Sequence, residues 1–287
     1  VVGEVTPESG RTLDLKAGTP VVASGHDTQF ALVGSGAKPG EVVLSSGTWE
    51  ILEMRVPSFK PDRAGFEGGL ITEADAEKGL WNPQLLMMGS AVLEWIRERF
   101  YPDLGGRDYG TMIEEASRLR AGSGGVMVLP SFVPDSGPTR KHGTRGTILG
   151  LTLQASRAHV YRAALEGLSF QLRHALRILE ESVGFDARGI RVVGGGSRNE
   201  LWNQIRSDVT GLPVTVTEQR EATVLGAALT AFVGIGRYGS IGEAARAVKF
   251  RHKLFRPGRD RATYEKLFRK FVELPGKLAG HYGSFQA

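Results

Sequence analysis

A carboxylate beside a glycine is the first feature of the sequence that could do chemistry. Asp27 follows Gly25 and His26, directly after the apolar residues 21–23. An aspartate at the end of a strand, next to a glycine that lets a ligand approach the backbone, is suited to act as a general base. The same tripeptide also fits a turn in which the aspartate caps the following helix, and on its own it favours that structural interpretation.

Hydrogen-bond donors gather in residues 44–49, which read Leu-Ser-Ser-Gly-Thr-Trp between two apolar runs. This pattern predicts a hairpin over 41–54 with Gly47 and Thr48 at its tip. Backbone N–H groups and hydroxyls at such a tip can hold a phosphate. An ordinary hairpin turn uses the same residue types for conformational reasons, so the two interpretations are balanced.

Three consecutive glycines, at 194–196, follow a predicted strand at 190–193 and precede a predicted helix at 199–209. A glycine-rich turn that leads into a helix N-terminus is a favourable place for a nucleotide. A dinucleotide fingerprint requires a third glycine where Asn199 stands, and a P-loop requires a Lys-Ser/Thr pair that is absent here. The remaining alternatives are a glycine platform for a purine or ribose and a turn with a purely structural role.

The elements that must position these motifs follow one another along the chain. Apolar spacing predicts a long helix from an N-cap at Ser156 to a stop at Gly184, and a helix of small residues over 222–233 that is buried on all sides. Residues 130–147 are predicted to form a long loop. Further helices are expected at 28–33, 87–100, 109–120 and from 260 onward, and further strands at 69–72, 79–81, 126–129 and 214–216. Hairpins followed by alternating strands and helices indicate an α/β fold with a mixed β-sheet flanked by helices.

Composition excludes several classes of protein. Of the 287 residues, 41% are hydrophobic and 23% are charged, which predicts a packed globule. The absence of cysteine excludes disulfides, thiolate metal sites and a cysteine nucleophile. The net charge of +5 is spread along the chain rather than clustered, so we expect no nucleic-acid partner. No apolar run is long enough to span a membrane and no signal peptide is visible, so we expect no membrane partner and a cytoplasmic location.

Taken together and in this order, the three motifs resemble those of the FGGY carbohydrate kinases, members of the actin-like, ribonuclease H-like ATPase superfamily. The resemblance extends from about residue 21 to residue 255. Its most specific stretches are 25–32 and 44–51, which look like the L-fuculokinase branch of the family. Further matching stretches are 81–83, 92–95, 163–168 and 194–203.

The resemblance implies a role for each motif. Asp27 would be the catalytic base, taking the proton from a sugar hydroxyl as its oxygen attacks the γ-phosphate of ATP. His26 would bind the sugar, although a histidine that orients Asp27 or caps a turn is an equal alternative. The resemblance assigns nucleotide binding to Gly47, Thr48, Ser90, Glu94, Gly195, Gly196 and Asn199. Mg²⁺ would arrive with ATP, so no residue of this chain is expected as a metal ligand. Glu166, on the long apolar helix, is expected to be structural.

The resemblance also implies an organisation in three parts. Residues 1–24 would be a junction from a preceding lobe, 25–258 the C-terminal ATP-binding lobe and 259–287 a helical tail. The Asp-x-Gly-Thr motif of the family's N-terminal lobe is absent from these 287 residues. We therefore expect the N-terminal lobe of the same kinase as a partner, and we expect the isolated second lobe to be inactive. A homodimer is a further possible assembly.

The implied activity is transfer of a phosphoryl group from Mg-ATP to a primary hydroxyl of a ketose, converting L-fuculose to L-fuculose 1-phosphate. One alternative is another substrate of the family, such as L-rhamnulose or xylulose. A second alternative is a non-catalytic module of the same fold that senses nucleotide or sugar. A nicotinamide dehydrogenase is disfavoured because its glycine fingerprint is incomplete at Asn199.

Overall fold

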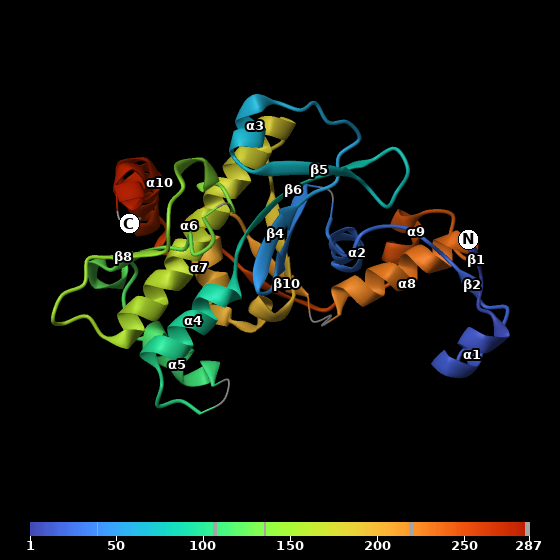
Figure 1. The fold of residues 1–287 in the computed structure, drawn as a ribbon, viewed down its shortest axis with the longest axis horizontal. Coiled ribbons are helices and arrows are strands. Elements are labelled where there is room, and N and C mark those ends of the chain that lie inside the picture. The colour runs from blue at the N-terminus through green and yellow to red at the C-terminus, as the bar shows by residue number, and fades with distance from the viewer. Residues whose placement is uncertain (39, 106–107, 135, 218–220, 285–287) are drawn as a thin grey trace.

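The computed structural model describes residues 1–38, 40–105, 108–134, 136–217 and 221–284, and its centre is a mixed β-sheet (Figure 1). Seven strands lie in the order β11-β10-β9-β3-β4-β6-β5. Their bounds are β3 Glu41–Ser46, β4 Trp49–Glu53, β5 Leu70–Ala74, β6 Trp81–Met88, β9 Gly189–Val193, β10 Val214–Thr217 and β11 His252–Phe255. Strand β9 pairs parallel with both β3 and β10, and the other neighbours pair antiparallel. The predicted α/β fold with a mixed sheet is confirmed.

The parallel strands determine where a site can form. Because β3, β9 and β10 run in the same direction, their carboxyl ends meet at one edge of the sheet. Ser45 of β3 lies opposite Val193 of β9, so the turns that follow these two strands begin side by side. Ligands of open α/β sheets bind outside the carboxyl ends of such strands.

Helices cover both faces of the sheet (Figure 1). On one face lie α2 Asp27–Gly34, α8 Ala222–Gly234 and α9 Ile241–Arg246, with α2 packed along α8. On the other face lie α4 Ser90–Phe100, α6 Arg157–Val183, α7 Glu200–Thr210 and α10 Arg261–Ser284. Smaller elements are α3 Arg63–Glu67, α5 Tyr109–Ser117, η1 Ser123–Gly125, β7 Met127–Leu129, η2 Arg140–His142, β8 Thr147–Leu149 and η3 Gly195–Arg198. Of these, α3, α5, η1 and β7 pack on α6.

Helix α6 forms where the sequence predicts it and supplies the centre of the core. It begins after Ser156 and ends at Gly184, whose φ of 70° is a left-handed conformation that glycine adopts without a steric penalty. Leu172 and Leu179 of α6 are fully buried and pack with Leu44 and Leu52 of the hairpin. The long helix therefore fixes the strands that carry the hairpin tip.

Two sequence predictions about the elements are wrong. Helix α8 is not buried on all sides, because it packs on α2 and α9 along one side only and leaves Val224 and Phe232 exposed at 64% and 46%. The strand predicted at 79–81 is much longer and reaches Met88, because Met87 and Met88 pair with Glu50 and Trp49 of β4 instead of starting the next helix.

The two ends of the chain differ in how they are held. Strands β1 Gly3–Glu4 and β2 Pro20–Val21 pair in a separate small sheet beside α1 Pro7–Leu13, at the edge of the molecule (Figure 1). Helix α10 instead joins the core, where Tyr264, Phe268 and Phe271 are buried against Phe170 of α6. Residues 285–287 of the predicted tail lie outside the described residues. The three-part division of the chain stays a prediction.

Candidate active site

The tip of the β3–β4 hairpin is docked onto the start of helix α4. The backbone N–H of Ser90 donates to the carbonyl oxygen of Gly47 at 2.9 Å, and the Ser90 hydroxyl donates to the same oxygen at 2.8 Å. The next two N–H groups at this helix start are also engaged, since Gly89 and Ala91 donate to the carbonyl oxygen of Thr48. The helix start is therefore used to hold the turn, and Thr48 itself is left exposed for a ligand.

The triple-glycine turn packs directly on strand β3. Gly194 has a φ of 84°, and a Cβ there would come within 2.7 Å of the carbonyl oxygen of Ser46. A Cβ on Gly196 would come within 2.1 Å of Ser46 Oγ, whereas one on Gly195 would meet nothing within 4 Å. Gly194 and Gly196 are thus required by packing, and Gly195 presents bare backbone toward open space. We call residues 47–48 and 194–196 together the glycine corner.

Asn199 supports the glycine corner from behind. Its Oδ1 accepts from the Trp202 N–H at 3.0 Å as the N-cap of α7, and its Nδ2 donates to the Tyr161 hydroxyl at 3.2 Å. The residue is only 8% exposed. Both ends of its amide are therefore engaged within the protein, which gives Asn199 a clear part in shaping the corner. Its predicted contact with a nucleotide stays a prediction.

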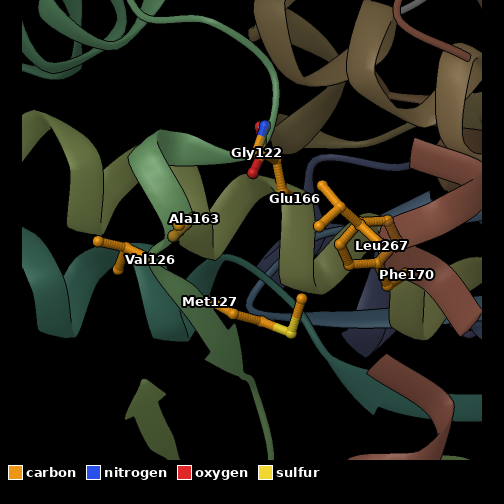
Figure 2. Close-up of a pocket in the computed structure, with 8 residues that line it drawn as sticks. Gly122, Val126, Met127, Ala163, Glu166, Phe170 and Leu267 are labelled. Atoms are coloured by element: carbon orange, nitrogen blue, oxygen red, sulfur yellow. The ribbon is translucent and has the colours of Figure 1, made fainter. Parts of the chain in front are cut away.

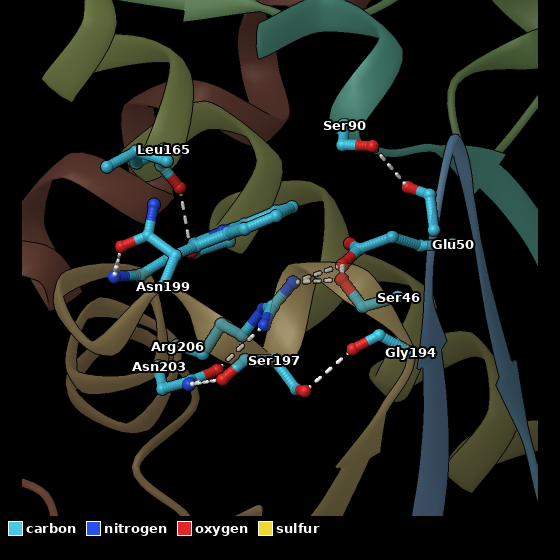
Figure 3. Close-up of polar contacts among 12 residues, drawn as sticks. Ser46, Glu50, Ser90, Leu165, Gly194, Ser197, Asn199, Asn203 and Arg206 are labelled. Carbon is cyan, nitrogen blue, oxygen red and sulfur yellow. Dashed lines mark hydrogen bonds and ion pairs between the residues drawn. The ribbon is translucent and has the colours of Figure 1, made fainter. Parts of the chain in front are cut away.

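A buried ion pair connects the two halves of the glycine corner (Figure 3). Glu50 follows the hairpin tip, Arg206 lies on α7 behind the glycine turn, and both side chains are fully buried. The Glu50 Oε1 accepts from Arg206 Nη2 and from Ser46 Oγ, the latter at 2.7 Å. Arg206 Nη1 also donates to Asn203 Oδ1 at 2.9 Å, and the guanidinium stacks 3.6 Å from the Trp202 ring.

Burial and pairing act in opposite directions on the charges of this pair. Burial raises the pKa of Glu50, and the Arg206 charge with the Ser46 and Arg206 hydrogen bonds opposes that rise. Burial likewise lowers the pKa of Arg206, and Glu50 opposes that fall. The sequence interpretation missed this pair. A usable signal was present, because Glu50 alternates with Leu52 on the inward side of the strand, where a charge needs a partner.

His26 and Asp27 lie at the start of α2. The Asp27 side chain is 74% exposed, its Oδ1 accepts from the Thr28 N–H at 2.8 Å, and His26 Nδ1 lies 3.2 Å from the same oxygen. Gln29, which the sequence interpretation missed, holds this end of the helix. Gln29 Oε1 accepts from the His26 N–H at 3.2 Å, and Gln29 Nε2 donates to the Ala74 carbonyl at 2.8 Å and to Glu73 Oε2 at 3.3 Å.

The predicted site residues other than Glu94 thus form two groups. The first group, Gly47, Thr48, Ser90, Gly195, Gly196 and Asn199, belongs to one continuous structure at the carboxyl ends of β3 and β9. The second group is His26 and Asp27, held by α2 and β5. Among the described residues, no hydrogen bond or ion pair joins the two groups. Any chemistry that needs both therefore needs a ligand between them.

The family of the chain follows from a comparison with known proteins. A family model described as "FGGY family of carbohydrate kinases, C-terminal domain" matches residues 42–235, which include the whole glycine corner. The chain belongs to the FGGY family of carbohydrate kinases.

Relatives within the FGGY family differ in the substrates that their names give. The L-fuculokinase of Salmonella typhi is 40% identical over 257 residues, which are 89% of this chain and 52% of that protein. The glycerol kinase of Acidiphilium cryptum is 31% identical over 277 residues, 94% of this chain and 53% of that protein. The crystal structure of xylulose kinase from Rhodospirillum rubrum superposes with a TM-score of 0.83 at 25% identity, covering 99% of this chain and 56% of that one. The chain spans about half the length of the curated relatives it matches.

Glu94 lies on helix α4 of this FGGY domain, four positions after Ser90. Its carboxylate is 32% exposed and accepts from Arg97 Nη2 at 2.7 Å and from the Tyr109 hydroxyl. These contacts tie α4 to α5 and orient the carboxylate. A direct contact of Glu94 with nucleotide stays a prediction.

Glu166 is structural, as the sequence predicts. Its Oε1 accepts from the Gly122 N–H and from the Tyr264 hydroxyl, both at 3.0 Å, and its Oε2 accepts from Ser123 Oγ at 2.9 Å. Burial raises the pKa of Glu166, and the adjacent Arg162 guanidinium opposes the rise. The cavity beside it holds about 30 Å³ (Figure 2), which is room for a water molecule and far too small for a sugar or a nucleotide.

Among the described residues of the FGGY domain, no group of three His, Asp or Glu side chains is placed to hold a metal ion. Among the helices that the structure describes, none is both long and apolar enough to cross a bilayer.

Proposed function

We propose that this chain is the nucleotide-binding half of a sugar kinase that transfers the γ-phosphoryl group of Mg-ATP to a primary hydroxyl of a ketose. The observation that carries the proposal is the glycine corner, in which the exposed Thr48 turn and the open Gly195 backbone lie at adjacent strand ends. Backbone N–H groups and a hydroxyl at one turn suit phosphates, and a bare glycine at the other suits a flat ring. The corner therefore fits a nucleoside triphosphate.

The substrate that the comparisons favour is L-fuculose, with L-fuculose 1-phosphate as product. The support is the identity of 40% to an L-fuculokinase against 31% to a glycerol kinase over similar spans. Residues 25–32 and 44–51 carry the motif resemblance to the same branch. L-rhamnulose and xylulose are the substrates to compare with it.

In the proposed reaction, Asp27 is the general base. The oxygen of the sugar hydroxyl forms a bond to the γ-phosphorus while the bond between that phosphorus and the β–γ bridging oxygen breaks, and ADP leaves. The hydroxyl proton passes to the Asp27 carboxylate, which is exposed and fixed only through one oxygen by the Thr28 N–H. His26, beside it, is placed to donate a hydrogen bond to another sugar oxygen.

The proposal requires a second lobe, because the described carboxylates of this chain form no metal site. Mg²⁺ would be held by the phosphates, water and carboxylates of the N-terminal lobe. That lobe would close over a ligand that lies between Asp27 and the glycine corner. We expect the lobe tested alone to bind nucleotide weakly and to turn over sugar at an undetectable rate.

An ADP-release assay with Mg-ATP tests the proposal. This chain is assayed alone and joined to the N-terminal lobe of its kinase, with L-fuculose, L-rhamnulose, D-xylulose and glycerol as acceptors. We expect activity only in the two-lobed protein, with the highest kcat/KM for L-fuculose. A two-lobed protein that binds ATP but releases no ADP with any acceptor would contradict the proposal and leave a sensing module of the same fold.

A further inference from the structure

A second cavity lies at the opposite end of the sheet from the glycine corner. Its volume is about 740 Å³, and it opens between α2, α9, the start of β3 and the end of β4. Residues of the glycine corner are absent from its lining. Small-molecule sites in proteins occupy a similar range, roughly 300 to 1,000 Å³. The cavity is therefore large enough for an organic ligand.

The interior of this cavity is apolar and built by close packing. Val43, Met54 and Val56 of the sheet line it together with residues of α2 and α9. The ring of Phe250 forms part of its wall and lies directly on Gly36, where an added Cβ would approach the ring to 2.6 Å. Gly36 has a φ of 68°, which a residue with a side chain adopts only with strain. The absence of a side chain at Gly36 therefore allows the Phe250 ring to pack there and form this wall.

The rim of the cavity is cationic. Lys38, Arg55 and Arg246 line it, and Lys38 and Arg246 have no ion-pair partner among the residues that the structure describes. Arg55 is already paired, since its Nε lies 2.9 Å from Asp75 Oδ1 and its Nη1 lies 3.8 Å from Glu77 Oε2. Glu41 is the acidic residue of the lining, and its Oε2 already accepts a hydrogen bond from Arg191 Nη2 at 2.8 Å.

We propose that this cavity binds an organic anion, with an apolar body against Val43, Met54 and Phe250 and an acidic group at Lys38 and Arg246. The acidic group of the anion would balance these two unpaired cations. Burial of the apolar portion of the ligand against the cavity wall contributes the hydrophobic share of the binding free energy. Because the rim is open to solvent, the charge contribution should weaken as salt is added.

The test uses two probes that differ by one charged group. 8-Anilinonaphthalene-1-sulfonate carries a sulfonate, and N-phenyl-1-naphthylamine is the same ring system without it. Fluorescence titrations of the purified chain measure both dissociation constants. We expect one saturable site for the sulfonate and binding at least tenfold weaker for the neutral amine. Equal affinities, or no saturable binding of the sulfonate, would overturn the proposal.

Variants of the chain locate the bound probe. Lys38→Glu with Arg246→Glu should weaken sulfonate binding at least tenfold, and Ala245→Trp, which fills the cavity, should abolish it. Because Lys38 and Arg246 are exposed, the charge variant decides the matter even if the tryptophan variant fails to fold.

A matched control removes the exposed apolar surface of α8 through Val224→Ser and Phe232→Ser. We expect this control to bind the sulfonate as the wild type does. Loss of binding in the control with retention in the cavity variants would place the probe on α8 and overturn the proposal. Displacement of the probe by Mg-ATP would place it in the glycine corner and also overturn it.

Discussion

Glu50 of β4 and Arg206 of α7 form an ion pair in which neither side chain is exposed to solvent. Glu50 lies two positions after Thr48 of the hairpin tip, and Arg206 lies on α7, the helix that follows the triple-glycine turn. Their contact therefore couples the two turns of the glycine corner. Ser46 hydrogen-bonds to both residues of the pair. A displacement of one turn would therefore displace the other.

The first prediction is that removal of one residue of this pair alone strongly destabilises the fold. Arg206→Met should lower the free energy of unfolding by about 3–5 kcal/mol, because it leaves the Glu50 charge buried without compensation. The double variant Glu50→Leu, Arg206→Met should recover much of that loss. Urea unfolding followed by circular dichroism measures all three proteins.

The exposed ion pair of Lys253 and Glu200 supplies the control for this experiment. Lys253→Met should change the stability little, since exposed pairs contribute little. Equal effects of Lys253→Met and Arg206→Met would show that burial does not determine the strength of the Glu50–Arg206 pair.

The second prediction separates packing from ligand binding at the triple glycine. Gly194→Ala should destabilise the fold by about 1–3 kcal/mol, because its Cβ would press on the Ser46 carbonyl. Gly195→Ala should leave the stability nearly unchanged, because its Cβ meets nothing, and should weaken nucleotide binding several-fold. Thermal unfolding and calorimetric titration with Mg-ATP measure the two effects. Unchanged nucleotide affinity in a folded Gly195→Ala protein would remove Gly195 from the site.

The predictability of this fold depends on the range of the interactions involved. Local spacing was sufficient for helix α6 and for the 41–54 hairpin, since N-caps, turn glycines and apolar periodicity act over a few residues. It was insufficient for α8, where small residues suggested burial on every side but Val224 and Phe232 are exposed. Composition alone does not show how many neighbours a helix has.

The candidate site was predictable as motifs but not as a geometry. The glycine corner could be expected once residues 44–49 and 191–199 were placed after neighbouring parallel strands. The Glu50–Arg206 pair joins positions 156 residues apart, and no local pattern connects them. The hydrogen bond from Gln29 to the Ala74 carbonyl spans 45 positions and is equally non-local. Such contacts depend on the order of the strands in the sheet, which the spacing of residue types along the sequence does not determine.

The third prediction concerns Asp27 in the two-lobed kinase. Asp27→Asn keeps the shape of the side chain but removes the base, so kcat should fall about 10²–10⁴-fold with little change in the KM for ATP. Steady-state assays at saturating sugar measure this effect. Asp14→Asn is the matched control, because Asp14 is exposed and its φ of 54° is one that asparagine tolerates. Turnover of Asp27→Asn at the rate of the Asp14→Asn control would exclude Asp27 as the base.

The fourth prediction is a loss of stability at acid pH that depends on His174 of α6. Burial is the main cause that lowers the pKa of His174 to about 4, and the positive charges of Lys141, Arg177 and His142 lower it further. The unfolded chain binds this proton near the ordinary pKa of about 6.5. Between these two values the unfolded state holds more protons, so the contribution is complete above pH 6.5 and is lost as the pH falls toward 4. Its full size is on the order of 3 kcal/mol.

Urea unfolding at pH 7 and at pH 4.5 isolates this contribution when wild type and His174→Gln are compared. Other acids titrate over the same range, but they are common to both proteins and cancel in the difference. We expect the wild type to lose more stability than His174→Gln, because glutamine takes up no proton on unfolding. His281→Gln, at the exposed end of α10, should follow the wild-type curve. Parallel curves for wild type and His174→Gln would mean that His174 is hydrated in the folded protein and takes up its proton there as readily as in the unfolded chain.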